Sequence, residues 1–509
     1  MKKICFFWGR RFVYVGHEMA KILQEEYNCK NFCAIITQRA GLNFLKNQTD
    51  VKYSNILLEE DVYKMYKDEQ LDYIYLADLE KEYGIPCLWT YIMSDRILMY
   101  GLLLRAYPSD TPIFNHEDML RILQVTSKQI KKFLNEEKPD VIFFSTITNL
   151  TNYLLYEIAR KNGIKTIMMY DTRIGGFGLT EEYDNHSFLE QALVNIKENP
   201  NDPQVFGLKK QAEKYLLEFQ RKPSYYMKNS EANNVHVANR AKKSYHFKFL
   251  QPRKLGTSIG WFIKSHYEYF INKNNDKEDY NTVKPWLEVW DKGVRKLRVL
   301  RGYNDLYDTM KKDEDFIYFA LHSEPEALPY LLAPYFKDQV WLIKQVARSL
   351  PVSYKLYVKD HPMMVGLRTR NFYKEIKKMP NVKLINPAIT SFDIIPHTKL
   401  AITITGTSAW ESILLKKPVI LFGKAFYHKI SSVKVCEKIS DLPYIIHEQL
   451  KLKSNNQEEI INFIAALYKE KAMVDLAQIW EIEGGANPEK KKLALAPLVK
   501  LFCDKVKLV

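Results

Sequence analysis

Short apolar runs alternate with amphipathic segments along most of this 509-residue chain. The run KICFFWG ends in a glycine, and after a loop that contains Gly16 the segment HEMAKILQEEY repeats its apolar positions at helical spacing. NFCAIIT is a second expected strand, and residues 58–135 are expected to be mostly helical. The pattern predicts alternating strands and helices from the first residues onward.

A strand–helix–strand unit is the clearest element of the first part of the chain. KPDVIFFS reads as a strand, NLTNYLLYEIARKNG as a helix, and IKTIMMYDTRIGG as a strand followed by a glycine-bearing loop. Such short joints predict a right-handed crossover and a parallel sheet, in which ligands bind beyond the carboxyl ends of the strands. The residues expected at that edge are Ser145, Thr146, Asp171, Thr172 and Arg173.

The alternation returns with better definition after residue 313. FIYFAL, YKLYVK, VKLI, KLAITIT and PVILFG are expected strands, and amphipathic segments such as FKDQVWLIKQVARSL and SAWESILLKK lie between them. The chain therefore predicts an α/β protein with two Rossmann-like doubly wound domains that face a cleft. The expected domains are 1–225, a helical insertion and linker at 226–312, a second Rossmann-like domain at 313–455, and C-terminal helices at 456–509.

Charge changes the picture because the net charge is +15, with an isoelectric point near 9.1. Anionic partners are expected, although a Lys-rich, AT-biased proteome accounts for the excess equally well. The segment 240–272 is rich in basic and aromatic residues. A packed amphipathic insertion is the favoured interpretation, while an anionic inner-membrane surface and nucleic acid are the alternatives. No nucleic-acid motif occurs in it, so no nucleic-acid partner is predicted.

The remaining composition favours a cytoplasmic protein. The six cysteines are scattered without a second pair at zinc-ligand spacing, which fits free thiols in a reducing compartment. No window approaches the roughly 18 uncharged apolar residues of a membrane span. The expected location is the cytoplasm, with peripheral contact at the inner membrane through 240–272 as an option.

The strongest candidate site combines two motifs that follow expected strands. Lys359 and His361 end one strand, and the later TITGTSAWES places Gly406, Thr407 and Ser408 at the start of a helix. A helix N-terminus with hydroxyls and nearby cationic or donor groups suits a phosphate. Glu411, one turn further, is positioned to accept hydrogen bonds from a ribose. The alternative is capping by Thr407 or Ser408, with Glu411 as the capping-box acid.

Further candidates for acid–base chemistry lie in LHSEPEAL and YDTRIGGFG. His322, Glu324 and Glu326 follow a strand and could act as acid or base or hold a divalent ion, although capping of the next helix by Ser323 or Glu324 is the alternative. Asp171 is the preferred catalytic carboxylate of the first domain. Arg173 and, in the N-terminal WGRRF, Arg10 are the expected contacts to an anionic acceptor.

The segments FALHSEPEA, WLIKQVARSLPVSYKLYVKDHP, NVKLINP and KLAITITGTSAWESILLKKPVILFG resemble the C-terminal half of the capsule polysaccharide biosynthesis proteins. That family includes bacterial β-Kdo transferases of the GT-B fold, and bacterial sialyltransferases are similar in their HP and Ser/Thr motifs. The resemblance covers about 315–425. It implies that His361 contacts the phosphate of the donor, that Thr407 and Ser408 bind the same group, and that Glu411 lies near the nucleotide. The family often has Gln where this chain has His322.

The resulting prediction is a glycosyltransferase of bacterial surface polysaccharide assembly that uses a nucleotide sugar, such as the CMP-activated ulosonic acid CMP-Kdo, and a glycan or glycolipid acceptor. Lys359, His361, Thr407 and Ser408 would stabilise charge on the leaving nucleotide, and Asp171 or Glu324 would act as base or nucleophile. No cofactor and no metal are predicted, since no DxD motif is evident. The alternatives are a UDP-sugar 2-epimerase, a CDP-polyol phosphotransferase, or a non-catalytic glycan-binding or export scaffold.

Overall fold

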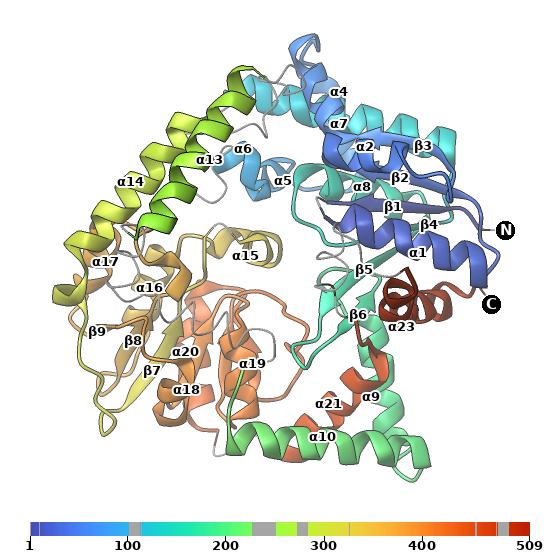
Figure 1. Ribbon diagram of the computed structural model, residues 1–509. Coiled ribbons are helices and arrows are strands. Elements are labelled where there is room, and N and C mark those ends of the chain that lie inside the picture. Colours follow the sequence, from blue (N-terminus) through green and yellow to red (C-terminus); the bar gives the residue numbers. More distant parts are fainter. Residues whose placement is uncertain are drawn as a thin grey trace. The chain divides into compact units, whose positions relative to one another are not determined.

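The protein divides into two compact units, each built around its own sheet (Figure 1). The structure is a computed structural model and describes residues 2–9, 11–100, 112, 114–225, 251–271, 284–324, 326–452, 456–474, 476 and 488–508. Unit 1 comprises Met1–Met99, Pro112–Lys209 and Ile464–Val509. Unit 2 comprises Tyr100–Thr111 and Lys210–Phe463.

The sheet of unit 1 has the strand order β13-β6-β5-β4-β1-β2-β3. Its five central and edge strands from β3 to β5 are parallel, while β6 runs antiparallel to β5 and β13 antiparallel to β6. The strands are β1 (Ile4–Trp8), β2 (Phe32–Ile36), β3 (Tyr53–Leu58), β4 (Val141–Phe144), β5 (Lys165–Asp171), β6 (Phe177–Thr180) and β13 (Lys471–Ala472).

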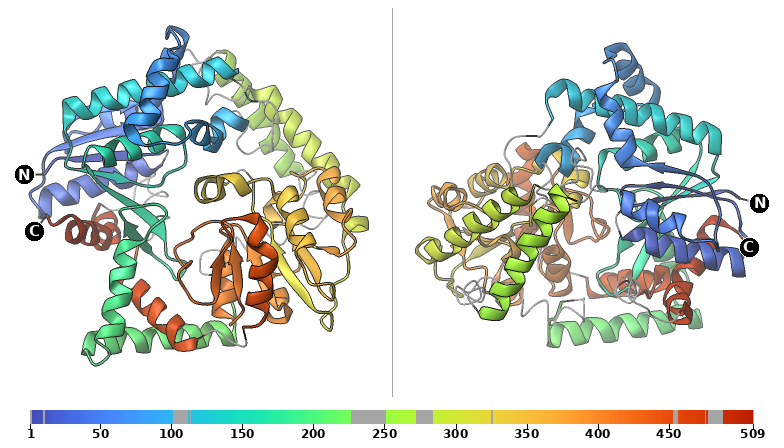
Figure 2. Two further views of the ribbon diagram at one scale, coloured as in Figure 1. Left: turned by 180° about the vertical axis from the view of Figure 1, so that it is seen from behind. Right: turned by 45° about the horizontal axis from the view of Figure 1, so that its top comes forward.

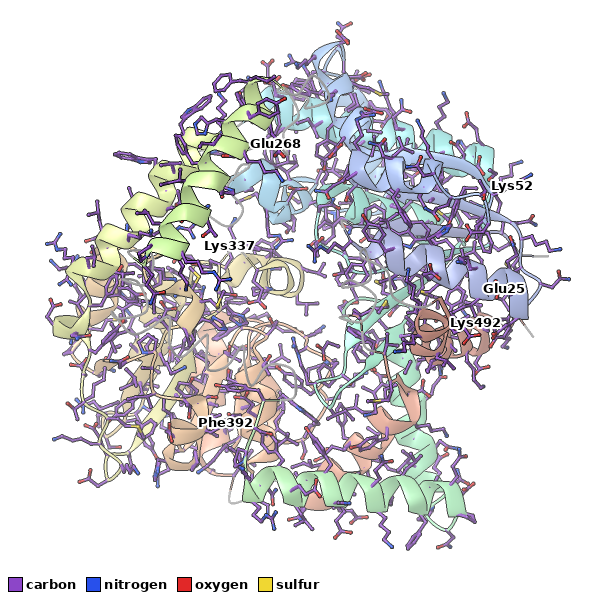
Figure 3. All side chains as sticks on the ribbon, in the orientation of Figure 1. Glu25, Lys52, Glu268, Lys337, Phe392 and Lys492 are labelled. Carbon is purple, nitrogen blue, oxygen red and sulfur yellow. The ribbon has the colours of Figure 1, made fainter. Side chains whose placement is uncertain are left out.

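The first and last described helices of unit 1 share one face of its sheet. Helices α1 (Phe12–Glu26) and α23 (Pro488–Val506) join the same apolar core as β1 and β2. Lys492 of α23 lies 2.9 Å from a carboxylate oxygen of Glu25 at the end of α1 (Figure 3). The other helices are α2 (Arg39–Lys46), α3 (Glu59–Lys64), α4 (Tyr73–Tyr83), α5 (Trp89–Ser94), α6 (Arg96–Tyr100), α7 (His116–Glu137), α8 (Leu150–Lys161) and α9 (Ser187–Glu198).

The expected loop around Gly16 is wrong, because Gly16 lies inside α1. A Cβ atom on Gly16 would lie 1.9 Å from Trp8 Cε2, so the missing side chain lets the helix pass directly over the indole of β1. The largely helical expectation for 58–135 holds for α3 to α7, but the preceding strand β3 was not predicted. Its residues are only partly buried and lack a continuous apolar run.

The sheet of unit 2 is entirely parallel and has the order β12-β11-β10-β7-β8-β9. Because β7 lies between β8 and β10, the carboxyl ends of these three strands are neighbours at one edge of the sheet. The strands are β7 (Phe316–Ala320), β8 (Lys355–Lys359), β9 (Val382–Ile385), β10 (Leu400–Thr403), β11 (Val419–Leu421) and β12 (Val433–Val435).

Helices cover both faces of this sheet, as the doubly wound pattern requires. Side chains of α16 (Gln339–Arg348), α17 (Arg370–Lys377) and α20 (Leu442–Leu450) share a core with Phe319 and Val358. On the opposite face, Ile394 of α18 (Ser391–Ile394) packs with Tyr318 and Tyr357. Successive side chains of each strand point to opposite faces of the sheet, and helices cover both faces. The strands are therefore buried on both sides and appear in the sequence as continuous apolar runs.

Two long helices of unit 2 form a pair outside the sheet. Helices α13 (Pro252–Phe270) and α14 (Pro285–Arg301) lie side by side in every view (Figure 2). The remaining helices of unit 2 are α15 (Ala327–Leu332) and α19 (Thr407–Leu414), while α10 (Pro203–Arg221) and α21 (Gln457–Glu470) each include a boundary between the units. Among the residues that the structure describes, no helix has the length and hydropathy that a membrane crossing requires.

The predicted fold class is confirmed, since each unit is a Rossmann-like α/β layer structure with parallel strands of the kind that GT-B proteins contain. The predicted cleft and the predicted domain boundaries stay predictions. The C-terminal residues Ile464–Val509, expected as separate helices, belong to unit 1, where α23 contributes Leu498 and Phe502 to the core.

Candidate functional site

The two predicted motifs flank the end of β7. Lys359, the last residue of β8, pairs with Ala320, the last residue of β7. On the other side of β7, Ile402 of β10 pairs with Phe319, so Thr403 and the following GTS segment lie at the same edge. The strand order therefore brings together residues that are more than forty positions apart in the sequence.

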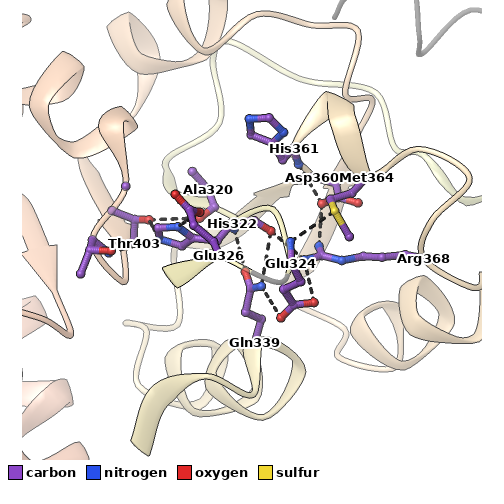
Figure 4. A network of polar contacts seen from close by, with 12 residues as sticks. Ala320, His322, Glu324, Glu326, Gln339, Asp360, His361, Met364, Arg368 and Thr403 are labelled. Carbon is purple, nitrogen blue, oxygen red and sulfur yellow. Dashed lines mark hydrogen bonds and ion pairs between the residues drawn. The ribbon is translucent and has the colours of Figure 1, made fainter. Parts of the chain in front are cut away.

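Asp360, which follows β8, braces the turn that carries His361 (Figure 4). Its side chain is fully buried and accepts hydrogen bonds from the His361 amide at 2.7 Å, from Arg368 Nη1 at 2.6 Å and from the Tyr373 hydroxyl at 2.5 Å. Burial raises the pKa of Asp360, and the Arg368 guanidinium opposes that change. Asp360 thus fixes the backbone of the turn through its own side chain.

His361 is a neutral hydrogen-bond donor. Its Nδ1 accepts a hydrogen bond from the Met363 amide at 3.2 Å, so the ring proton resides on Nε2. Burial, aided by the nearby Lys359 ammonium, lowers the pKa of His361 to about 4. In Figure 4 the ring points away from the Asp360 network. Of the two roles predicted for His361, cation or donor, the contacts favour the donor.

Lys359 is a buried cation beside this donor. Its side chain is only 7% exposed, and it forms no hydrogen bond or ion pair with any residue that the structure describes. Burial lowers its pKa to about 8, although the Glu411 and Asp360 carboxylates favour the charged form. At neutral pH most Lys359 side chains carry a charge that these carboxylates compensate only from a distance. An anion at the strand end would supply the missing partner.

The start of α19 is an uncapped helix N-terminus. Gly406 is the N-cap residue and makes no side-chain capping hydrogen bond, so the alternative interpretation, capping by Thr407 or Ser408, is wrong. Both residues are partly exposed in the first turn, where free N–H groups and the helix dipole attract an anion. The Tyr427 hydroxyl donates to the Gly406 carbonyl at 2.6 Å and holds the turn in place.

Gly406 is closely surrounded by its neighbours. A Cβ atom there would lie 2.8 Å from Thr403 Oγ1, which would have to shift, and 3.3 Å from Ser408 Oγ, which is a tight contact. The helix therefore starts against the end of β10.

Glu411 is buried and accepts a hydrogen bond from Ser391 Oγ at 2.8 Å. It raises the pKa of Lys359, which places the carboxylate within electrostatic reach of the ammonium. Because the N-cap is Gly406, Glu411 lies too far along α19 to be a capping-box acid. Its predicted contact with a ribose stays a prediction.

His322 connects the ends of β7 and β10. The Thr405 amide donates to His322 Nε2 at 3.2 Å, so Nδ1 carries the proton and donates to Glu326 Oε2 at 3.0 Å. Thr403 Oγ1 lies 3.1 Å from the same Nε2. Both ring nitrogens are thus engaged within the protein. These contacts favour a positioning role, and the catalytic role predicted for His322 stays a prediction.

Glu324 belongs to the same buried network. It accepts from Gln339 Nε2 at 2.6 Å and from Arg368 Nη2 at 3.1 Å, and Arg368 also donates to the His322 carbonyl at 2.7 Å. Arg368 therefore joins the loops after β7 and β8. The predicted catalytic role of Glu324 is untested, but its carboxylate is paired with a guanidinium.

Asp171 and Arg173 lie in unit 1, at the end of β5 and in the loop that follows. The Arg173 amide donates to Asp171 Oδ1 at 2.8 Å, and the two charged groups approach to 3.6 Å. Arg173 has a left-handed backbone, with φ of 60°. Their predicted roles as catalytic carboxylate and acceptor contact stay predictions. Arg10 lies outside the described residues.

Sequence reasoning missed four residues that shape the site: Gln339, Arg368, Tyr373 and Tyr427. Arg368 lies in the basic LRTR segment and looks like a surface residue, yet it is completely buried. One signal was available. A carboxylate directly after a buried strand, such as Asp360, requires a cationic or hydroxyl partner, and the nearest downstream arginine is Arg368. Across the described residues, no group of three His, Cys, Asp or Glu side chains is arranged to hold a metal ion.

A comparison with known protein families matches one part of the chain. Residues 337–431 match the family model described as capsule polysaccharide biosynthesis protein. The predicted family resemblance is confirmed. The matched segment lies within unit 2 and includes Lys359, His361, Gly406, Thr407 and Ser408.

Solved structures of low identity align with the chain, each with a TM-score below 0.5. Two are β-Kdo transferases named KpsC from Thermosulfurimonas dismutans. The 2,7 transferase has 12% identity, covers 73% of this chain and 89% of its own, and has a TM-score of 0.36. The 2,4 transferase has 13% identity, coverages of 68% and 84%, and a TM-score of 0.35. A UDP-GlcNAc 2-epimerase from Methanocaldococcus jannaschii has 13% identity, coverages of 92% and 98%, and a TM-score of 0.26. No curated protein matches the chain in sequence.

Proposed function

We propose that the protein is a nucleotide-sugar-dependent glycosyltransferase of capsule polysaccharide biosynthesis, with unit 2 as the donor-binding unit. The donor to test first is a CMP-activated ulosonic acid such as CMP-Kdo. The acceptor would be a glycan or glycolipid. The family match of residues 337–431 supports the biosynthetic setting, and the chemistry of the strand ends supports the kind of donor.

The observation that carries this proposal is the buried ammonium of Lys359 beside two further anion-binding elements. His361 offers a neutral Nε2–H donor, and α19 offers the free amides and hydroxyls of Thr407 and Ser408. A cation and a neutral donor after β8, with a helix N-terminus after β10 on the other side of β7, are the kinds of group that bind a phosphate diester.

The same groups would lower the barrier to transfer. When the bond between sugar and phosphate breaks, negative charge develops on the leaving phosphate oxygens. Lys359 and the α19 dipole would stabilise that charge more strongly in the transition state than in the bound donor, which is the requirement for catalysis. His361 would donate its Nε2 proton as a hydrogen bond while it remains neutral, so it needs no change of protonation during the cycle.

The test is product formation by the purified full-length protein. The protein is incubated with CMP-Kdo, other CMP-sugars, UDP-sugars and CDP-polyols, with and without capsule-derived acceptors, and nucleotide release and products are followed by mass spectrometry. We expect release of CMP and a product heavier than the acceptor by one sugar residue. Interconversion of free UDP-sugars would instead indicate an epimerase, and release of no nucleotide from any donor would reject the transferase.

Matched variants identify the site responsible. Lys359→Met and His361→Ala should each lower the rate at least about tenfold. Lys355→Met changes a lysine at the opposite end of the same strand, and His397→Ala changes a histidine before β10. Both controls should leave the rate near that of the unchanged protein. Equal rates in all four variants would show that transfer occurs elsewhere.

A further inference from the structure

The helix pair α13 and α14 exposes an unusually large apolar surface. On α13 the exposed apolar side chains recur at positions that lie on one face of a helix. They are Leu255, Ile259, Phe262, Ile263, Tyr267 and Phe270. Scattered exposed apolar residues are normal, but a continuous stripe on a helix indicates a surface that is covered in the working protein.

A second stripe runs along α14. Trp286, Trp290, Leu297 and Leu300 follow one another at intervals of four, seven and three residues, which keeps them on one helical face. Trp290 is 73% exposed and Leu297 is 67% exposed. The stripes meet at the end of the pair, because the rings of Phe270 and Trp286 stack with centroids 6.1 Å apart. The two helices therefore present one joined apolar face.

The other side of α14 packs against the loop that carries the candidate site. Val299 is buried, and a Cβ atom on Gly366 would lie 2.5 Å from its Cγ2 atom. Arg298 Nη1 donates to the Leu367 carbonyl at 2.6 Å. Leu367 lies three residues after Met364, the last residue of the turn that follows His361. The exposed stripe of α14 is therefore its outer face, while its inner face supports the segment from Pro362 to Arg368.

Basic residues outnumber acidic residues on both helices. Residues 251–271 contain three Lys or Arg residues and one acidic residue. Residues 284–301 contain six Lys or Arg residues and two acidic residues. The acidic side chains each approach a basic side chain one turn away on the same helix: Glu268 approaches Lys264, Glu288 approaches Lys292, and Asp291 approaches Arg295. Arg253, Lys254 and Arg301 are exposed and form no ion pair with any described residue. The surplus charge is therefore positive.

We infer that the joined face of α13 and α14 docks on an anionic lipid surface. Apolar and aromatic side chains along one helical face, with lysine and arginine beside them, are the features of helices that lie in the plane of a membrane interface. Tryptophan and tyrosine prefer that interface because their rings are apolar and their polar atoms remain hydrated. The positive surplus complements anionic headgroups, whereas a second copy of this face would bring like charges together. Figure 3 shows the side chains of this pair, with Glu268 marking α13.

The test is vesicle binding by the full-length protein, which is independent of any enzymatic activity. Co-sedimentation is measured with phosphatidylcholine vesicles that contain or lack phosphatidylglycerol. We expect binding to the anionic vesicles that weakens as salt is raised. The tryptophan emission should shift to the blue in their presence. Binding to neither vesicle, or equal binding to both, would overturn the inference.

Variants connect the binding to this face. Trp290→Glu combined with Leu297→Glu should lower the partition coefficient at least about tenfold, since two inserted side chains are replaced by anions. Arg253→Glu combined with Lys254→Glu should remove the preference for anionic lipid. Tyr444→Glu, on the exposed face of α20 and 73% exposed, is the control and should change nothing. If the first double variant binds as the unchanged protein does, or abolishes a concentration-dependent self-association instead of vesicle binding, the inference is wrong.

Discussion

Arg368 Nη1 lies 2.6 Å from Asp360 Oδ1, and the side chains of both residues are fully buried. The guanidinium also reaches the His322 carbonyl and Glu324, so one cation connects the loops after β7 and β8. The turn that presents His361 is therefore held by a buried charge pair. Its rigidity comes from residues that do not themselves face the candidate ligand.

Breaking this pair should destabilise unit 2 strongly. Arg368→Met leaves Asp360 buried without its cation, which should lower the free energy of unfolding by about 3–5 kcal/mol. Urea unfolding followed by tryptophan emission measures the change. Asp305→Ala is the control. It breaks an ion pair with Arg370, an arginine two residues after Arg368, and the Asp305 side chain is 63% exposed. That variant should lose at most about 1 kcal/mol. Equal losses would refute the distinction.

Replacing Lys359 should improve stability while it harms ligand binding. Lys359→Met removes an ammonium that is buried without a close partner, so the free energy of unfolding at neutral pH should rise by about 1–3 kcal/mol. The affinity for a nucleoside monophosphate should fall at least about tenfold. Lys355→Met at the other end of β8 should affect neither quantity. A destabilised Lys359→Met variant would show that Lys359 serves the fold.

Lys359 should also make nucleotide binding sensitive to alkaline pH. Its pKa of about 8 lies below its ordinary value, and a bound phosphate favours the charged form. Binding at a pH above 8 should therefore take up a proton, and the affinity should fall as the pH rises further. Titration calorimetry in buffers of different ionisation enthalpy measures the uptake. Lys359→Met should show none, and uptake that persists in this variant would assign the proton to another group.

His361 should lower the stability of the protein in acid. Its pKa of about 4 in the folded protein lies below its ordinary value of about 6.5, so the unfolded chain binds more protons between these values. The stability that neutral His361 contributes to the folded protein is fully present above pH 6.5 and is lost as the pH falls toward 4. The difference in unfolding free energy between the unchanged protein and His361→Gln should change by about 1–3 kcal/mol across this range. A constant difference would mean that His361 is not held neutral.

Gly406→Ala should disturb the start of α19. The added methyl group would meet Thr403 Oγ1 and Ser408 Oγ, so the helix start must shift. We expect a stability loss of about 1–3 kcal/mol and a weaker affinity for the nucleoside monophosphate. Gly207→Ala is the control, since nothing lies within 4 Å of its Cβ position in α10. It should be neutral or stabilise by up to about 1 kcal/mol. Unchanged affinity in Gly406→Ala would separate the helix start from the site.

Much of the second sheet could be predicted because its strands are buried on both faces and appear as unbroken apolar runs, as in FIYFA and KLYVK. For the same reason the candidate residues Lys359, which ends β8, and His361, which follows it, could be placed at the end of a strand. Strand β13 has two residues and β6 has four, too few for periodicity to indicate a strand.

Other features depend on partners that the local sequence does not reveal. Gly16 resembles a loop glycine until Trp8 is seen against it. Arg368 and Gln339 resemble ordinary polar residues of exposed segments, because burial of a polar side chain is set by tertiary contacts. The engagement of His322 with Thr405 likewise joins residues 83 positions apart. The sequence located the candidate residues, whereas the structure shows which of them are engaged in contacts within the protein.

The central claim is that Lys359, His361 and the start of α19 bind the phosphate of a nucleotide. Calorimetric titration of cytidine against CMP, and of uridine against UMP, measures this contribution directly. We predict that one monophosphate binds at least about tenfold more tightly than its nucleoside, and that the difference disappears in Lys359→Met and in His361→Ala. Equal affinity for nucleoside and monophosphate in both pairs, or a preference that survives both substitutions, would contradict the account.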